Sequence, residues 1–383
     1  MYNGIMIDRQ NKEEINQDIL EKIVLITGPR QTGKTTLSKS LVSNYEYINY
    51  DEISHRKILM DKSWNRDVEA IIFDEIHKMT EWKRYLKGIY DTEGVRPKLI
   101  VTGSARLDVF RKVGDSLAGR FFKHRLYPFD IKELLFGNPD ANPSDLLDQL
   151  IKTSGYPEPF LKGTEAYYKR WRKNHLDIIL RQDVLDLVAI KQLNELGTLI
   201  ELLRYRVGSP ISYASLARDI QVSPQTIKQW LMILESLYVV FKVQPYTQRV
   251  TRSILKEPKY YFYDTAYVEG DMGVKLENHV ALSLLKEAHR VEDLYGDTIS
   301  VHYCRSRNGQ EIDFCIVKNK IVTHLIEVKL SDNQLSKQFN YFGSLFQDAK
   351  QIQWVKNCSR TQTFPNGAMI CNAANGLSKL SFE

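Results

Sequence analysis

The sequence of 383 residues is long enough for two to four domains of about 100–200 residues each. Its composition, 43% hydrophobic and 26% charged, is that of a globular protein with sizeable cores. The net charge of +6 permits an acidic partner such as nucleic acid but does not require one. No apolar run approaches the roughly 20 residues that span a bilayer, and the first residues lack the pattern of a signal peptide. Because the four cysteines form no CxxC pair, we expect reduced thiols in a cytoplasmic protein without membrane contact, and neither a disulfide framework nor a zinc site.

The first predicted element is a buried strand at residues 23–27, followed by a glycine-rich turn and a helix. The turn reads GPRQTGKT, which is the spacing GxxxxGK[ST] of a phosphate-binding loop. Backbone N–H groups of such a loop wrap a phosphate, the lysine reaches the β- and γ-phosphates, and the final hydroxyl holds Mg²⁺. The predicted nucleotide-binding residues are Gly28, Pro29, Arg30, Gln31, Thr32, Gly33, Lys34, Thr35 and Thr36, with Thr35 on the metal.

A second buried strand at residues 70–75 reads AIIFDE and ends in two carboxylates. Asp74 suits the Mg²⁺ contact that follows a phosphate-binding loop. Glu75 is placed to orient and deprotonate an attacking water. Because a kinase has less reason for a second carboxylate at this position, the pair favours nucleotide hydrolysis over transfer to another substrate.

A third strand at residues 98–107 ends in polar residues. At the tip of a strand between the first two, such a side chain would contact the γ-phosphate or the attacking water, so we expect Ser104, and after it Thr102, in this role. Arg120 then follows a turn of small residues. Arg120 would complete the nucleotide site of a neighbouring copy by stabilising charge on the transferring phosphate. Alternatively, it would form a surface or interdomain salt bridge.

A resemblance to a known family rests on five stretches: ITGPRQTGKTTL, IIFDEIHK, IVTGSA, SLAGR and LYPF. These residues make the sequence similar to bacterial and archaeal AAA-type P-loop ATPases that carry a carboxyl-terminal domain of unknown function with a nuclease-like fold. The resemblance extends over nearly the whole chain. It implies ATP as the nucleotide and ring-like or transient homo-oligomers.

A linker-like stretch at residues 137–145 ends the first predicted domain, because Pro and Asn break helices and start turns. The chain then reads as mostly helical to residue 187. A basic run in this region consists of Lys169, Arg170, Arg172 and Lys173. It would contact a phosphate backbone or form a solvated helix face, and the pattern favours the solvated face.

Residues 211–243 have the pattern of two helices joined by a short turn and followed by β strands. Ser223 is placed to cap the second helix, in which apolar residues recur at helical spacing. In a winged helix of this type Gln225, Lys228 and Gln229 would project outward, where such a helix meets the major groove. Winged helices also dock proteins, so DNA, RNA and a protein partner all stay open.

Two strand-like runs between residues 309 and 330 flank the turn signal KNK. With the turn near Asn319, Glu311 lies opposite Glu327, and Asp313 is the diagonal neighbour on the same face. Lys329 follows Glu327 by two residues and points to that face as well.

A helix before this hairpin carries Glu277 at the edge of its apolar stripe, where the carboxylate needs a partner. Its approach to the hairpin would complete the layout of PD-(D/E)xK nucleases, in which carboxylates hold Mg²⁺ and a lysine positions the attacking water. The predicted second metal site consists of Glu277, Asp313 and Glu327 with Lys329. Nuclease-like folds also serve as binding modules, so cleavage itself stays open.

The sequence therefore predicts an α/β fold with a doubly wound parallel sheet of the P-loop AAA type. Its predicted domains are an ATPase domain (1–140), a helical linker region (141–200), a winged helix (201–250) and a nuclease-like domain of the restriction-endonuclease type (251–383). The expected function is Mg²⁺-dependent ATP hydrolysis that moves the last two modules on nucleic acid. The alternatives are an ATP-gated nuclease and a non-catalytic nucleotide switch that docks a protein.

Overall fold

The computed structural model describes the chain except for residues 1–6, 104–116, 184–191, 248–256, 332–333 and 359. The chain divides into two compact units, Met1–Tyr127 (unit 1) and Pro128–Glu383 (unit 2). The four-part division made from the sequence stays a prediction.

Unit 1 is built on a parallel five-stranded sheet with the order β2-β3-β4-β1-β5. Its strands are β1 (Ile23–Thr27), β2 (Tyr45–Asn49), β3 (Ala70–Asp74), β4 (Lys98–Thr102) and β5 (Phe121–Arg125). Every residue of β1 and β3 is buried, as expected of strands covered on both faces. The predicted parallel α/β fold is therefore confirmed for this unit, and β4 lies between β1 and β3 as the sequence suggested.

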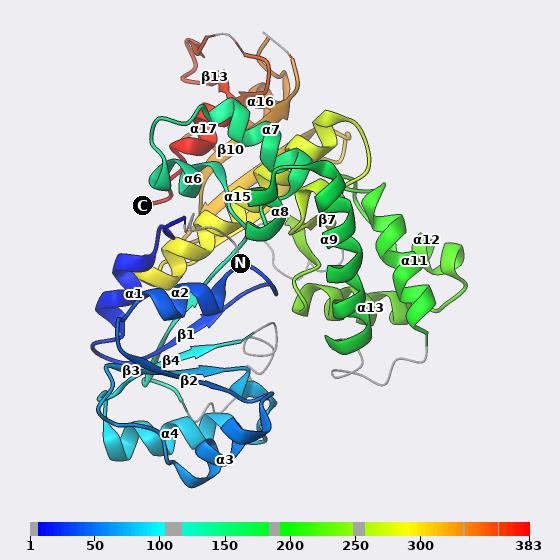
Figure 1. Cartoon of the computed structure of the whole chain (residues 1–383). Coiled ribbons are helices and arrows are strands. Elements are labelled where there is room, and N and C mark those ends of the chain that lie inside the picture. The colour runs from blue at the N-terminus through cyan, green and yellow to red at the C-terminus, as the bar shows by residue number, and fades with distance from the viewer. Residues whose placement is uncertain (1–6, 104–116, 184–191, 248–256, 332–333, 359) are drawn as a thin grey trace. The chain divides into compact units, whose positions relative to one another are not determined.

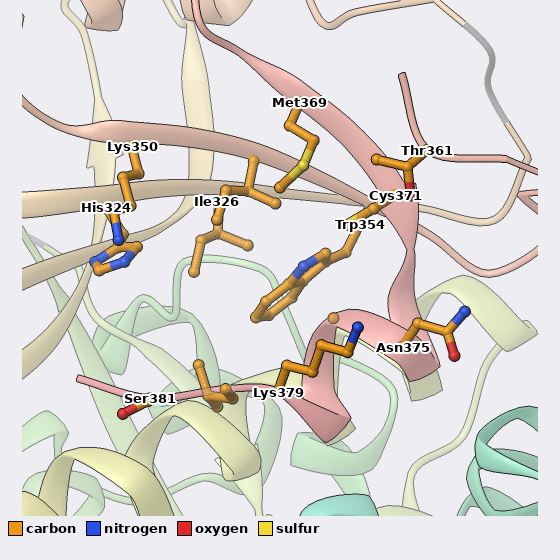
Figure 2. A pocket seen from close by; sticks show the side chains of 13 residues that line it. His324, Ile326, Lys350, Trp354, Thr361, Met369, Cys371, Asn375, Lys379 and Ser381 are labelled. Carbon is orange, nitrogen blue, oxygen red and sulfur yellow. The ribbon is translucent and has the colours of Figure 1, made fainter. Parts of the chain in front are cut away.

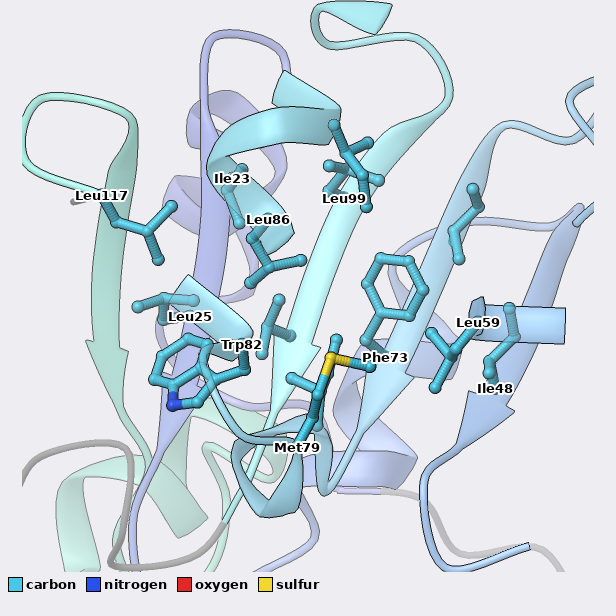
Figure 3. Close-up of a cluster of buried hydrophobic side chains, with 14 of the residues drawn as sticks. Ile23, Leu25, Ile48, Leu59, Phe73, Met79, Trp82, Leu86, Leu99 and Leu117 are labelled. Atoms are coloured by element: carbon cyan, nitrogen blue, oxygen red, sulfur yellow. The ribbon is translucent and has the colours of Figure 1, made fainter. Parts of the chain in front are cut away.

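Helices cover both faces of this sheet (Figure 1). The helices are α1 (Lys12–Asp18), α2 (Lys34–Ser40), α3 (Ile53–Asp61) and α4 (Trp82–Glu93), with a short 3-10 turn η1 (Ile76–Lys78) after β3. Helices α1 and α2 pack against one face through Ile15 and Leu37. On the opposite face Leu59, Trp82 and Leu86 enclose Phe73 (Figure 3). Burial of both faces holds the carboxyl ends of the strands, where the predicted nucleotide site lies, in fixed positions.

Unit 2 begins with helices, of which the structure describes α6 (Ile131–Gly137), α7 (Pro143–Thr153), α8 (Pro157–Lys162), α9 (Glu165–Ile178), a π-helical turn η2 (Ile179–Asp183), α11 (Leu193–Arg204), α12 (Tyr213–Ile220) and α13 (Pro224–Ser236). The Ser223 hydroxyl accepts a hydrogen bond from the Thr226 backbone at 3.0 Å, which caps α13 as predicted. The buried side of α13 consists of Ile227, Trp230, Leu231 and Leu234.

The second half of unit 2 is an eight-stranded sheet with the order β12-β13-β11-β10-β9-β8-β6-β7. The strands are β6 (Val240–Pro245), β7 (Lys259–Phe262), β8 (Ile299–Arg305), β9 (Glu311–Lys318), β10 (Ile321–Lys329), β11 (Lys350–Val355), β12 (Gln362–Thr363) and β13 (Met369–Asn372). The helices here are η3 (Thr265–Tyr267), α15 (Met272–Tyr295), α16 (Gln338–Leu345) and α17 (Ala373–Ser378). Because β6 pairs with both β7 and β8, the sheet continues across residue 250, where the sequence suggested a boundary between modules.

In the described part of the chain, no helix combines the length and the apolar character needed to cross a membrane. All four cysteines are free thiols, as predicted, and three of them are buried.

Candidate functional site

The phosphate-binding loop follows β1 and leads directly into α2. Gly28 has φ +141°, and a Cβ at this position would lie 2.1 Å from the carbonyl oxygen of Leu126. Gly33 has φ +91°, so the loop bends through two positions that disfavour side chains. The Lys34 ammonium donates to the carbonyl oxygen of Gly28 at 3.0 Å and to that of Pro29. The loop therefore has the conformation and the lysine that its sequence predicted.

Asp74, at the end of β3, accepts hydrogen bonds from three hydroxyl groups on three different elements. Thr35 of α2 donates to Oδ2 at 2.9 Å, and Tyr47 of β2 donates to the same oxygen at 2.7 Å. Thr102 of β4 donates to Oδ1 at 2.6 Å. The hydroxyl of Thr35 and the carboxylate of Asp74 thus lie side by side, and oxygen ligands of this kind suit Mg²⁺. The residues present fit the magnesium ion that accompanies a nucleotide.

Glu75 sits in a left-handed backbone conformation with φ +56°, and its backbone N–H donates to the carbonyl of Thr102 at 3.1 Å. Its Oε2 lies 3.5 Å from His77 and 3.6 Å from Lys78, but this buried oxygen has no hydrogen-bond partner among the described residues. Burial raises the pKa of the Glu75 carboxyl above its usual range. A buried acceptor with raised proton affinity fits a group that receives a proton from water.

Tyr47 was not predicted from the sequence. The stretch YEYIN reads as an ordinary strand, and the contact with Asp74 depends on β2 lying beside β3. The ammonium of Lys39 lies 3.8 Å from the centre of the Tyr47 ring, so α2 holds the tyrosine from a second side.

The remaining predicted nucleotide residues occupy less specific positions. Thr32 donates its hydroxyl to the carbonyl of Pro29 at 2.9 Å and so braces the loop. The positive charge of Arg30 acts on the Glu75 carboxyl. Gln31 and Thr36 are exposed. Ser104 lies outside the described residues, and Thr102 contributes through its hydrogen bond to Asp74.

Arg120 forms an ion pair with Asp91 of α4 at 2.7 Å. It directly precedes β5, whose first residue, Phe121, pairs with Ile23, the first residue of β1. Because the phosphate loop follows the other end of β1, Arg120 lies at the opposite end of the sheet from this chain's own loop. The role in a neighbouring copy stays a prediction.

The acidic site of unit 2 consists of four carboxylates and two lysines: Glu277, Glu311, Asp313, Glu327, Lys259 and Lys329. Its buried lysine, Lys259, has no signal in the sequence. Lys259 is 1% exposed, and its ammonium lies 2.6 Å from Glu311 and 3.6 Å from Glu277. Glu277 also accepts a hydrogen bond from Tyr261 at 2.7 Å. A Cβ on Gly208 would lie 2.8 Å from Glu277 Oε2, so the segment before α12 packs directly onto this carboxylate.

The predicted hairpin residues of the acidic site meet on β9 and β10. The Lys329 ammonium lies 2.8 Å from Glu327, and the backbone N–H of Val328 donates to Asp313 at 2.8 Å. Ser336 Oγ lies 3.4 Å from Glu327 Oε1, and Glu327 Oε2 is buried with no hydrogen-bond partner in the described part of the chain.

The register of this hairpin differs from the prediction. The structure pairs Ile326 with Phe314, so the next pair along the strands joins Glu327 to Asp313. Glu311, which we expected opposite Glu327, instead contacts Lys259.

Two local features cause the difference in register. The turn residues Asn319 and Lys320 both have positive φ, which gives a tight two-residue turn. The pairing then shifts between Val322 and His324, where one extra residue is accommodated. The sequence signals a turn at KNK, but it signals neither the length of this turn nor the shift in pairing that follows.

Four carboxylates and two ammonium groups make the acidic site negative. Burial, followed by the charge of Asp313, raises the pKa of Glu277 and of Glu327 to about 7. Burial lowers the pKa of Lys259, but the neighbouring carboxylates outweigh it and raise the pKa overall. Among the described residues, no group of three or more His, Cys, Asp and Glu side chains is arranged to hold a metal ion. The second metal site, Glu277, Asp313 and Glu327 with Lys329, therefore stays a prediction.

The exposed side of α13 presents Gln225, Lys228 and Gln229. In the basic run of α9, Lys169 pairs with Glu165 at 2.7 Å, and Arg172 lies over the rings of Tyr168 and Tyr267. Part of that run therefore serves contacts within the unit.

Three family models match successive parts of the chain. Residues 20–135 match the AAA domain, residues 144–270 match a domain of unknown function (DUF8612), and residues 272–373 match another domain of unknown function (DUF4143). The first match supports an AAA-type ATPase. The other two matches assign no activity to unit 2.

Relatives of similar length come from archaea and bacteria. An uncharacterized protein of Methanocaldococcus jannaschii is 25% identical over 382 residues, with 88% of this chain and 83% of the relative covered. An uncharacterized protein of Haemophilus influenzae is 24% identical over 377 residues, with 88% and 92% covered. An uncharacterized protein of Mycobacterium tuberculosis is 23% identical over 304 residues, with 77% and 67% covered.

The similar solved structures include a variant of Thermotoga maritima RuvB and the Aeropyrum pernix ORC1 protein in complex with DNA. The RuvB variant has a TM-score of 0.33 and 19% identity, with 62% of this chain and 90% of that chain covered. ORC1 has a TM-score of 0.33 and 12% identity, with 72% and 93% covered. Likeness at this level carries no functional conclusion.

Proposed function

We propose that unit 1 binds and hydrolyses MgATP and that hydrolysis moves the helical and nuclease-like parts of unit 2 on nucleic acid. The observation that carries this proposal is the arrangement of Thr35, directly after the phosphate-binding loop, with Asp74 and Glu75 at the end of β3. Thr35 and Asp74 share a hydrogen bond at 2.9 Å, and Glu75 follows with a buried oxygen that accepts no hydrogen bond from the described residues. This combination supports hydrolysis over simple nucleotide storage.

Each group has a defined task in this proposal. Thr35 and Asp74 would hold the magnesium ion, which supplies charge neutralisation on the phosphates. Lys34 would exchange its contacts with the carbonyls of Gly28 and Pro29 for contacts with the phosphate oxygens. Glu75 would orient a water and take its proton. Because burial raises the pKa of Glu75, its carboxylate is a stronger base than that of an exposed glutamate.

The nucleic-acid part of the proposal rests on α13. The capped start of α13, its buried side and the exposed Gln225, Lys228 and Gln229 support a role as recognition helix, and the strand β6 that follows supports a wing. Because β6 belongs to the same sheet as β9 and β10, a movement of α13 and β6 would be transmitted to the acidic site.

A phosphate-release assay tests this function. We expect ATP turnover with Mg²⁺, none with EDTA, and stimulation by double-stranded DNA, single-stranded DNA or RNA. Turnover far below about 1 s⁻¹ with every nucleic acid would instead support a nucleotide switch that docks a protein partner.

An ATP-gated nuclease is the second candidate, because the hairpin brings Asp313, Glu327 and Lys329 together. It predicts cleavage of DNA or RNA with Mn²⁺ or Mg²⁺ that is lost in Asp313→Ala and Lys329→Ala. Lack of cleavage across substrates, with ATP and either metal, would exclude it. Lys259 already provides a counter-charge between two of the carboxylates, which favours the ATPase proposal without cleavage.

A further inference from the structure

Unit 2 contains a cavity of about 450 Å³ between the strands β10, β11 and β13 and the segment 375–381 (Figure 2). This volume is within the range of sites that bind small organic molecules. Ile326, Ile352, Trp354 and Met369 are among the side chains that line it, and these apolar groups come from three neighbouring strands. The cavity therefore has an apolar interior formed by rigid elements.

The charged residues at this cavity have one sign. Lys350 and Lys379 are both exposed, and no Asp or Glu is among the lining residues. Neither lysine forms an ion pair with the described residues. His324, which also lines the cavity, stays neutral near pH 7 because burial, and then the charge of Lys350, lowers its pKa to about 4. An apolar interior flanked by two lysines without an acidic partner among the described residues matches a ligand with an apolar body and an acidic group.

We propose that this cavity binds an amphipathic anion, with its apolar body against Trp354 and Ile352 and its acid group paired with Lys350 or Lys379. In Figure 2 the Trp354 indole lies between the strands and the segment that carries Lys379. A charge-assisted contact with a lysine adds to the burial of apolar surface and fixes the orientation of the ligand.

The position of Trp354 depends on a glycine of α17. A Cβ on Gly376 would lie 2.3 Å from the indole Nε1, so the helix approaches the ring as closely as a residue without a side chain allows. The indole is 3% exposed and therefore lies at the inner side of the cavity, where it would report a bound ligand by its fluorescence.

This site is distinct from the acidic site. Ile326, which lines the cavity, directly precedes Glu327 on β10, and successive side chains of a strand point to opposite faces. The proposal does not depend on nucleotide hydrolysis.

The test uses the full chain and the fluorescent dye 8-anilinonaphthalene-1-sulfonate, with N-phenyl-1-naphthylamine as its uncharged counterpart. We expect saturable binding of the anionic dye that weakens at least tenfold in Lys350→Met/Lys379→Met. Lys173→Met, at an exposed lysine of α9, should change it less than twofold. Binding of the uncharged dye should stay within twofold in all variants.

Competition identifies the ligand class. Decanoate should displace the anionic dye, decanol should displace it much less, and MgATP should leave it bound. Equal dye binding by the double variant, equal displacement by decanol, or displacement by MgATP would overturn the proposal. Circular dichroism and the melting temperature of each variant show that the fold is retained.

Discussion

The hydroxyl of Tyr47 donates a hydrogen bond to Asp74 Oδ2 at 2.7 Å, and the same oxygen accepts a hydrogen bond from the Thr35 hydroxyl. If Thr35 turns toward a magnesium ion, Asp74 keeps the hydrogen bonds from Tyr47 and Thr102. We therefore expect Tyr47 to be a positioning residue that holds the Asp74 carboxylate when Thr35 contacts the metal.

Tyr47→Phe should weaken the binding of MgATP about tenfold, because a hydrogen bond to a charged group contributes roughly 1.5–3 kcal/mol. ATP binding in EDTA should stay nearly unchanged, since Asp74 would contact the metal and not the phosphates. Titration with a fluorescent ATP analogue measures both affinities. Tyr45→Phe on the same strand is the matched control, and equal losses with and without Mg²⁺ would contradict the positioning role.

Gly28→Ala should destabilise unit 1 by about 3 kcal/mol or more and abolish nucleotide binding. The new Cβ would overlap the carbonyl of Leu126 in a backbone conformation that side chains rarely adopt. Gly88→Ala is the control, because a Cβ in the middle of α4 meets no atom within 4 Å. It should raise the free energy of unfolding by about 0.5–1 kcal/mol. Chemical denaturation measures both variants, and similar effects would show that the loop has relaxed.

Because Glu327 is buried, the free energy of unfolding should fall as the pH rises. Its pKa is raised from 4.5 to about 7 in the folded state, so the folded protein binds more protons than the unfolded chain between these values. The unfolding free energy then decreases through this window. Glu327→Gln removes the effect, so the variant should gain a few kcal/mol relative to the wild type between pH 4.5 and 7. Denaturation in EDTA, with Glu13→Gln at an exposed position as control, measures the difference. If the free energies of unfolding of wild type and Glu327→Gln changed with pH in parallel, the raised pKa of Glu327 would be contradicted.

Lys228→Ala should weaken nucleic-acid binding by roughly three- to tenfold and reduce the slope of log affinity against log salt by about one. The reason is that the exposed ammonium on α13 would contact a phosphate. Fluorescence anisotropy with labelled DNA and RNA at several salt concentrations gives both quantities. Lys57→Ala, at an exposed position of α3, should have no effect. An unchanged salt slope in Lys228→Ala would assign α13 to another partner.

The candidate nucleotide site was largely predictable from the sequence, because β1 and β3 are continuous apolar runs that lead into polar residues. β1 ends before the glycine loop, and β3 ends in Asp74. Tyr47 could not be predicted, since its role depends on the order of strands in the sheet and not on a local pattern. The structure forms the salt bridge that was the alternative role of Arg120, but no local pattern indicated its partner Asp91.

In unit 2 the sequence indicated the residues of the acidic site but not their arrangement. One extra residue near Thr323 changes the pairing of the hairpin, and such irregularities have weak sequence signals. Lys259 stands at the start of an apolar run, and this pattern does not signal a buried ammonium. Its burial follows from Glu277 and Glu311, which lie on other elements. The parallel pairing of β6 with β8 is likewise a tertiary contact without a local signal.

The central claim is that Glu75 activates the water that attacks ATP at a site formed by Lys34, Thr35 and Asp74. The most direct test compares wild type, Glu75→Gln and Lys34→Ala in parallel binding and phosphate-release assays with MgATP. We predict that Glu75→Gln binds ATP as tightly as the wild type but hydrolyses it at least 100-fold more slowly, and that Lys34→Ala loses turnover. Normal turnover by Glu75→Gln, or a folded wild-type protein that does not bind ATP, would contradict the account.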